Sequence, residues 1–146
     1  MEWLTRLSGA IVGLDSAPLI YYIEESPQYI AVVQPFFDAL DRSAFQAITS
    51  TVTLLEVLVH PLRRRDQKLA EQYCDILTNS PGLRTIPVYE DIAQIAAQIR
   101  ARYPIRTPDA IQLATSIHQG ASFFLTNDRR LPAIPQLAIV VLDDLR

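Results

Sequence analysis

Four acidic residues, Asp15, Glu56, Asp109 and Asp128, are the strongest candidates for chemistry in this sequence. Four carboxylates brought into one cleft would repel one another and could not all stay ionised without compensation. A hard divalent cation bound through oxygen ligands provides that compensation, and Mg²⁺ or Mn²⁺ fits an all-carboxylate site better than zinc. Such an ion lowers the pKa of a bound water and polarises a phosphodiester. The chemistry we expect is therefore metal-dependent hydrolysis of a phosphate ester.

Glu56 is the least expected of these acids because its neighbours between positions 52 and 59 are almost all apolar. A carboxylate buried in such surroundings would become neutral unless it had a partner. Asp residues at helix starts and in turns have common structural roles, so Asp109 and Asp128 are less informative alone. We interpret Glu56 as the strongest single indication of a site.

Short polar residues next to the acids are suited to orient metal ligands or a water molecule from a second layer. These residues are Ser16, Thr126 and Asn127. Arginines also lie within a few positions of the acids, and they could contact nucleic-acid phosphates or an acidic segment of a partner protein. They are Arg106, Arg129 and Arg130. Solvated surface charge is an equally good explanation of the three arginines.

The elements that must position these residues alternate between short apolar runs and helical patterns. We expect strands at 10–14, 46–50, 83–88, 121–126 and 137–142. Helical patterns lie between them, at 16–25, 28–42, 51–63, 67–79, 91–103 and 107–119. This alternation predicts an α/β fold, a three-layer α/β/α sandwich around a central and mainly parallel sheet.

Helix-cap residues and prolines indicate where the helices begin, bend or end. Ser16, Ser50 and Thr107 are candidates for helix caps, and Pro108 suits a first helical position. Pro35 predicts a kink or a junction of two helices, and Pro61 predicts the end or a bend of its helix.

The predicted fold brings the acids together. Asp15 and Asp128 come just after strands, and Glu56 and Asp109 lie in the early turns of helices. The carboxyl ends of parallel strands meet at one edge, where active sites of such sheets open. We therefore expect one cleft with no arginine, lysine or histidine required among the four carboxylates.

The amino-acid composition is that of an ordinary globular protein. The 146 residues are enough for a single domain, which we assign to 1–146, with 1–9 as an N-terminal extension. The one cysteine cannot form an internal disulfide. The sequence shows neither a signal-peptide pattern nor a long apolar stretch. We therefore expect a cytoplasmic protein. The net charge of −3 leaves nucleic acid open as a partner, because basic charge is nearly all arginine, which suits phosphate.

Four blocks of the sequence resemble the signature blocks of the PIN-domain family, in the right order. They are LDSAPLIYYIEE, ITSTVTLLEVLVHPL, RTPDAIQLATSI and FFLTNDRRL, which together span residues 14 to 131. They are most similar to those of bacterial VapC-type toxins. The resemblance implies an Mg²⁺- or Mn²⁺-dependent endoribonuclease, a homodimer and a cognate antitoxin that blocks the cleft. It places the family's acidic residues at the four positions above, with Thr126 as the polar residue beside the last acid.

Two features depart from that pattern. Many toxins of this type have Asn two residues after the first Asp, where this chain has Ala17, and the first Asp comes about ten residues later than usual. Two other functions stay open: a housekeeping PIN-fold nuclease that processes RNA, and a noncatalytic module whose acids bind a basic protein. A phosphoacceptor receiver domain fits poorly, because Lys68, the only lysine, lies in the middle helices.

Overall fold

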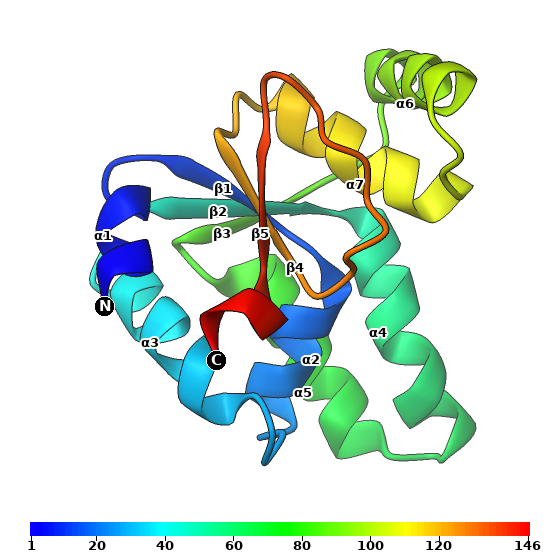
Figure 1. Cartoon of the computed structure of the whole chain (residues 1–146). Coiled ribbons are helices and arrows are strands. Elements are labelled where there is room, and N and C mark those ends of the chain that lie inside the picture. The colour runs from blue at the N-terminus through cyan, green and yellow to red at the C-terminus, as the bar shows by residue number, and fades with distance from the viewer.

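The computed structural model describes residues 1–146 as a five-stranded sheet with helices on both faces (Figure 1). The strands are β1 (Ile11–Leu14), β2 (Gln46–Ser50), β3 (Leu83–Ile86), β4 (Phe123–Thr126) and β5 (Ala138–Val141). The helices are α1 (Glu2–Leu7), α2 (Ser16–Ile23), α3 (Ile30–Asp41), α4 (Thr51–Arg63), α5 (Gln67–Asn79), α6 (Glu90–Arg102) and α7 (Thr107–His118), followed by the 3₁₀ helix η1 (Leu142–Leu145). No helix has both the length and the apolar character that crossing a bilayer requires.

The sheet is parallel throughout and has the strand order β3-β2-β1-β4-β5. All five predicted strands are present, and the predicted α/β/α architecture is confirmed. The chain adds β2 and β3 on one side of β1, and then β4 and β5 on the other. The direction of strand addition therefore reverses between β1 and β4, and in doubly wound sheets a reversal of this kind opens a crevice beyond the strand ends.

Alternating side chains divide the interior into two layers. Val12 and Leu14 of β1 and Leu125 of β4 belong to one cluster, which they share with α1, α2, α3 and α5. Phe124 of β4 points to the other face, where α6 and α7 supply the packing. This period-two alternation, with apolar residues on both sides, explains why the strands read as continuous apolar runs in the sequence.

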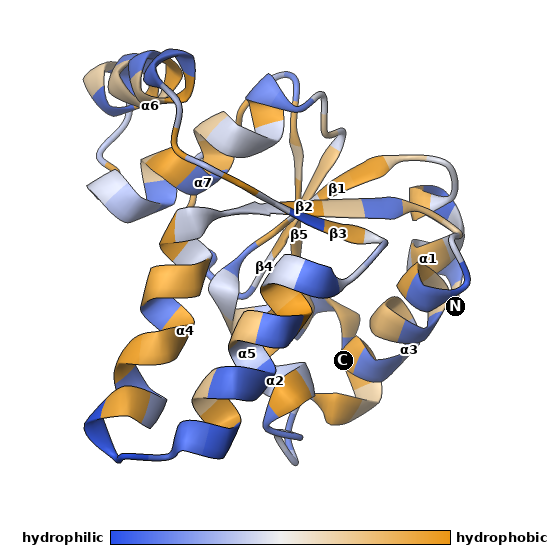
Figure 2. Cartoon of the chain, turned by 180° about the vertical axis from the view of Figure 1, so that it is seen from behind, coloured by the Kyte–Doolittle hydropathy of each residue, from blue (hydrophilic) through white to orange (hydrophobic).

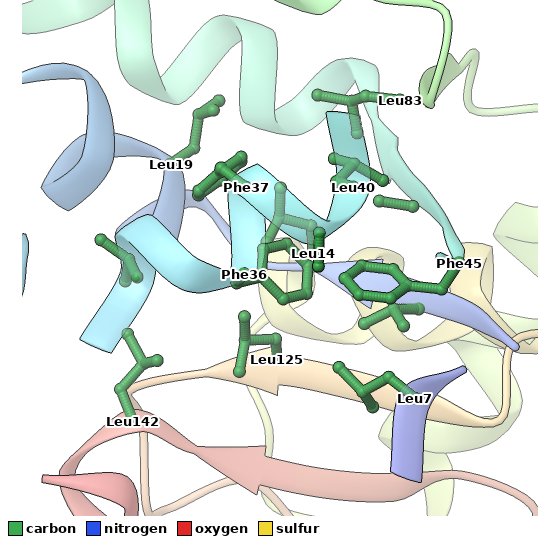
Figure 3. Packing of buried hydrophobic residues seen from close by; sticks show 14 of the residues in the cluster. Leu7, Leu14, Leu19, Phe36, Phe37, Leu40, Phe45, Leu83, Leu125 and Leu142 are labelled. Atoms are coloured by element: carbon green, nitrogen blue, oxygen red, sulfur yellow. The ribbon is translucent and has the colours of Figure 1, made fainter. Parts of the chain in front are cut away.

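Aromatic side chains fill much of the first layer. Phe36 of α3 is fully buried and packs against Phe37 and Phe45, and leucines from several elements surround them (Figure 3). The predicted extension contributes to the same layer, because Leu7 of α1 is 2% exposed and Trp3 stacks on Phe36. Residues 1–9 are therefore part of the packed structure.

Two of the three predicted helix caps are wrong, and one is confirmed. Asp15, not Ser16, caps α2, and its Oδ1 accepts the Ser16 amide hydrogen at 2.8 Å. Helix α7 begins at Thr107, one residue earlier than expected, because the Thr107 hydroxyl accepts a hydrogen bond from Arg100 and does not cap. The prediction for Ser50 is confirmed, since its hydroxyl accepts the Val52 amide hydrogen.

Pro35 and Pro61 both lie inside continuous helices, which excludes one of the two outcomes predicted for each proline. Helix α3 runs unbroken through Pro35, so the predicted junction of two helices is wrong. Helix α4 continues past Pro61 to Arg63, so the predicted end at this proline is wrong as well.

Candidate active site

The candidate site lies where the direction of strand addition reverses. Asp15 directly follows the central strand β1, and Asp128 comes two residues after its neighbour β4. Thr126, the last residue of β4, joins the two acids: its buried hydroxyl donates to Asp15 Oδ2 at 2.7 Å and accepts the Asp128 amide hydrogen at 3.1 Å. The hydroxyl therefore fixes the Asp15 carboxylate relative to the backbone at Asp128.

Asp15 is the most constrained acid of the site. Burial raises the pKa of the Asp15 carboxyl, the hydrogen bonds from Thr126 and Ser16 lower it, and the charges of Asp109 and Glu56 raise it further. The net direction is upward. The last contribution means that Asp109 and Glu56 lie near enough to Asp15 for their charges to be felt.

Glu56 reaches the site from α4, but its surroundings differ from the prediction. The residue is exposed, and so are its apolar neighbours Leu55, Val59 and Leu62, at 65%, 37% and 55%. Glu56 is therefore not the buried carboxylate that its apolar neighbours predicted, because those neighbours are themselves exposed. Ser16 connects Glu56 to the site by donating from its hydroxyl to Glu56 Oε1 at 2.9 Å.

Two of the three arginines predicted beside the site are paired with the other two acids, although the prediction required no arginine among the carboxylates. Arg106 Nε lies 3.3 Å from Asp109 Oδ2, and the Arg130 guanidinium forms a fork on both oxygens of Asp128. Arg130 is the main reason that the pKa of Asp128 lies below its usual range. These four residues line one hollow of about 110 Å³.

Two other predicted residues lie beside the site with partners elsewhere. The Asn127 side chain donates to the Tyr21 hydroxyl and accepts the Asp143 amide hydrogen, so it ties the loop after β4 to α2 and η1. Arg129 pairs with Asp144 at 2.6 Å. The partners of both side chains are at the C-terminus or in α2, not among the candidate ligands.

A buried polar network beneath the site was not predicted. Gln112 of α7 donates to the Thr53 hydroxyl of α4 and accepts from Ser50, while Thr49 contacts both Thr53 and the Leu14 carbonyl oxygen. All four polar side chains are buried and all are hydrogen-bonded. The network joins β2, α4 and α7 to the residue preceding Asp15, and a satisfied network of this kind rigidifies its surroundings. Polar residues inside apolar helices, Thr53 and Gln112 above all, were the sequence signal for it.

The candidate ligands offer oxygen atoms of the kind that a hard divalent cation binds. Carboxylate and hydroxyl oxygens alone are available, which is the chemistry that Mg²⁺ and Mn²⁺ prefer. The acids have different partners and form two separate groups. Glu56 and Asp15 both bond to Ser16, whereas Asp109 and Asp128 are paired with arginines. No three acidic, histidine or cysteine side chains lie together within reach of one ion. The donors fit such an ion chemically, and their convergence on it would require side-chain rotation.

The chain matches one protein-family model over most of its length. The model of the PIN domain matches residues 12–137. The match begins at the second residue of β1, includes β2 to β4 and all four acids, and ends one residue before β5. No curated protein matches the chain.

Solved structures share the fold at low sequence identity. The VapBC2 complex of Rickettsia felis bound to a promoter DNA fragment contains a chain with TM-score 0.70 and 17% identity, over 90% of this chain and 98% of that one. A chain in a toxin–antitoxin complex from Klebsiella pneumoniae has a TM-score of 0.64 and 21% sequence identity, over 89% of this chain and 96% of that one. Mycobacterium tuberculosis VapC20, a toxin that cleaves the sarcin–ricin loop, has a TM-score of 0.65 and 17% sequence identity, over 79% of this chain and 87% of that one.

Proposed function

This chain belongs to the PIN-domain family, and from that premise we propose that it is an Mg²⁺- or Mn²⁺-dependent endoribonuclease, the toxin of a toxin–antitoxin pair. The observation that supports the proposal is the placement of the acids: Asp15 and Asp128 follow the adjacent strands β1 and β4, and the charge of Asp109 raises the pKa of Asp15. Glu56 is joined to the same place through Ser16, whose amide hydrogen Asp15 accepts. The similar chains in VapBC and other toxin–antitoxin complexes favour a toxin over other PIN-domain nucleases.

Within this proposal each acid has a role that its position suggests. Asp15 and Asp109 would bind the ion directly, while Glu56 and Asp128 would bind it through water or position the attacking water. A bound ion would supply an activated water and stabilise the leaving oxygen of an RNA phosphodiester. Ser16 and Thr126 hold the Asp15 carboxylate in one orientation by hydrogen bonds to its two oxygens. Ala17 offers no polar group at its position, so Ser16 is the polar contact between α2 and Glu56.

An antitoxin is the partner we propose, and the apolar stripe on α4 supports this proposal. Leu55, Val59 and Leu62 are exposed on the helix that carries Glu56, and Figure 2 shows α4 as largely hydrophobic along its length. A partner that covered this stripe would bury apolar surface beside the cleft and would restrict access to it. The homodimer implied by the resemblance remains a prediction.

Cleavage of cellular RNA by the purified chain tests the proposed activity. Wild-type protein should cut RNA at discrete positions with Mg²⁺ or Mn²⁺, EDTA should stop the reaction, and Asp109→Asn should reduce the rate by at least 100-fold. Asp75→Asn is the matched control, because Asp75 is an exposed acid of α5 outside the site. It should keep the wild-type rate after the same purification.

Each other outcome has a definite meaning. Equal cleavage by wild type and Asp109→Asn would contradict the assigned site. An active enzyme whose induction leaves growth unaffected in cells without any antitoxin would favour a housekeeping nuclease. Absence of both cleavage and metal binding would favour a noncatalytic module that binds a basic protein.

A further inference from the structure

Both oxygens of Asp128 are held by its own loop. The Arg130 Nε donates to Oδ1 at 3.0 Å, Nη2 donates to Oδ2 at 3.2 Å, and the Arg130 backbone N–H donates to Oδ1 at 2.9 Å. Residues only two positions apart in the chain therefore form a local ring that includes a bidentate ion pair. Asp109 has a single and longer contact of the same kind with Arg106, at 3.3 Å.

The four charges surround one small hollow, which Pro104, Ile105 and Leu131 complete. The side chains of Asp128 and Asp109 are only 24% and 20% exposed, whereas those of Arg130 and Arg106 are 84% and 71% exposed. The guanidinium groups thus cover the carboxylates from the solvent side. Nothing else in the structure holds the Arg130 guanidinium, because Asp128 is its only hydrogen-bond partner.

We propose that Arg130 is an exchangeable internal counter-ion, which occupies Asp128 until a divalent cation takes its place. This inference rests on the proposed function, and it concerns how the cation gains access to the site. An exposed arginine–carboxylate pair contributes little free energy because solvent screens it. A divalent cation that binds several oxygen ligands interacts more strongly with the same carboxylate. The pair is therefore strong enough to orient Asp128 and weak enough to be displaced.

Arg130 should accordingly compete with metal. Removing the fork in Arg130→Gln should tighten Mn²⁺ binding about two- to fivefold, the range that corresponds to a surface ion pair. Arg130→Lys keeps the charge but cannot form the bidentate contact, so its affinity should lie between those of wild type and Arg130→Gln. Arg129→Gln is the matched control, since Arg129 is adjacent in sequence but pairs with Asp144. It removes the same charge without freeing Asp128.

Two measurements on the full chain test the inference. Calorimetric titration with Mn²⁺ gives the affinities of the wild type and the three variants. NMR of the arginine Nε–H groups during titration with Mg²⁺ follows the pair directly, and the missing signal in Arg130→Lys assigns the resonance. The Arg130 signal should shift as Mg²⁺ binds, while the Arg129 signal should stay in place.

The outcomes separate this inference from the proposed function. Tighter binding in Arg130→Gln than in Arg129→Gln, with movement of the Arg130 signal, supports the exchange. Metal binding that is the same in wild type and Arg130→Gln, or raised equally by both Gln variants, overturns the exchange and leaves the proposed nuclease intact. Failure of wild type and Arg130→Gln alike to bind Mn²⁺ or Mg²⁺ overturns both.

Discussion

Thr126 is the residue on which the geometry of the acids most depends. Its single hydroxyl links Asp15 of the β1 edge to the amide of Asp128 beyond β4, and it is fully buried. A buried hydroxyl that both donates and accepts fixes its two partners relative to each other. The polar residue beside the last acid therefore has a physical role here: it fixes the Asp15 carboxylate relative to the backbone at Asp128.

Replacement of Asp15 by Asn should stabilise the metal-free protein at neutral pH. The raised pKa of Asp15 means that the folded state binds a proton more readily than the unfolded state, so its ionised form opposes folding above that pKa. Each unit by which the pKa is raised corresponds to about 1.4 kcal/mol. Asp15→Asn should thus raise the melting temperature in EDTA at pH 7, and the gain should shrink as the pH falls toward the ordinary Asp value of 3.8.

Thermal unfolding between pH 7 and pH 4 measures this effect. Asp75→Asn serves as the control because Asp75 is exposed and belongs to α5, so its effect should not follow the same pH dependence. A stability gain that did not change with pH, or a loss at every pH, would show that burial of the Asp15 charge does not oppose folding.

At the residue scale the sequence predicted the elements on which the four acids lie, but not how their side chains would pair. Asp15 and Asp128 were predicted correctly at strand ends because strand periodicity and parallel topology determine those positions. The Arg130 fork depends on a local turn and on side-chain rotation, which spacing does not encode. Glu56 was misjudged for another reason: an apolar helix face can be left open for a partner, so apolar neighbours do not prove burial.

Helix α7 and strand β1 approach each other closely at Gly13. A Cβ at this position would overlap Ser116 Oγ and would lie 2.8 Å from Phe124 Cδ1 and 2.9 Å from Ser116 Cβ. Glycine therefore allows α7 to lie directly against β1. The consequence is functional, because α7 carries Asp109 at its start and β1 leads into Asp15.

Gly13→Ala should lower the free energy of unfolding by about 1–3 kcal/mol, the usual cost of overpacking a core. It should also slow cleavage, since α7 and Asp109 must move away from Asp15. Urea denaturation and the RNA assay measure the two effects. Combining it with Ser116→Ala should recover part of the stability, because the two substitutions act on one contact. Simple additivity of the two losses would argue against this packing explanation.

The elements themselves were largely predictable. Five strands and the helices between them followed from apolar runs and helical spacing, and each strand was found within the predicted range. The connection from β4 to η1 was not predictable: Asn127, Tyr29 and Asp143 meet there through hydrogen bonds between residues up to 114 positions apart. Contacts this distant in sequence depend on the completed fold.

For the whole molecule, the N-terminal helix closes one face of the core. Leu7 is 2% exposed within the first layer, and α1 is only six residues long, so its stability must come from this packing. Leu7→Ala should lower the free energy of unfolding by about 2–5 kcal/mol, as expected for a buried leucine. Thr5→Ala is the matched control on the exposed side of α1 and should change stability by no more than about 0.5 kcal/mol.

Chemical denaturation of both variants, followed by circular dichroism, compares these values. A small effect of Leu7→Ala, similar to that of Thr5→Ala, would mean that residues 1–9 are dispensable for the fold. In that case a chain beginning near β1 should fold on its own.

Trp3 gives the molecule a built-in optical reporter. It is the only tryptophan in the chain, and its ring is parallel to that of Phe36 at 6.3 Å between centroids. Its fluorescence therefore records whether α1 is docked on α3, while circular dichroism records the helices as a whole. Release of α1 before global unfolding would separate the two signals during a single denaturation experiment. The order in which the outer layer and the sheet come apart can thus be followed without attaching any label.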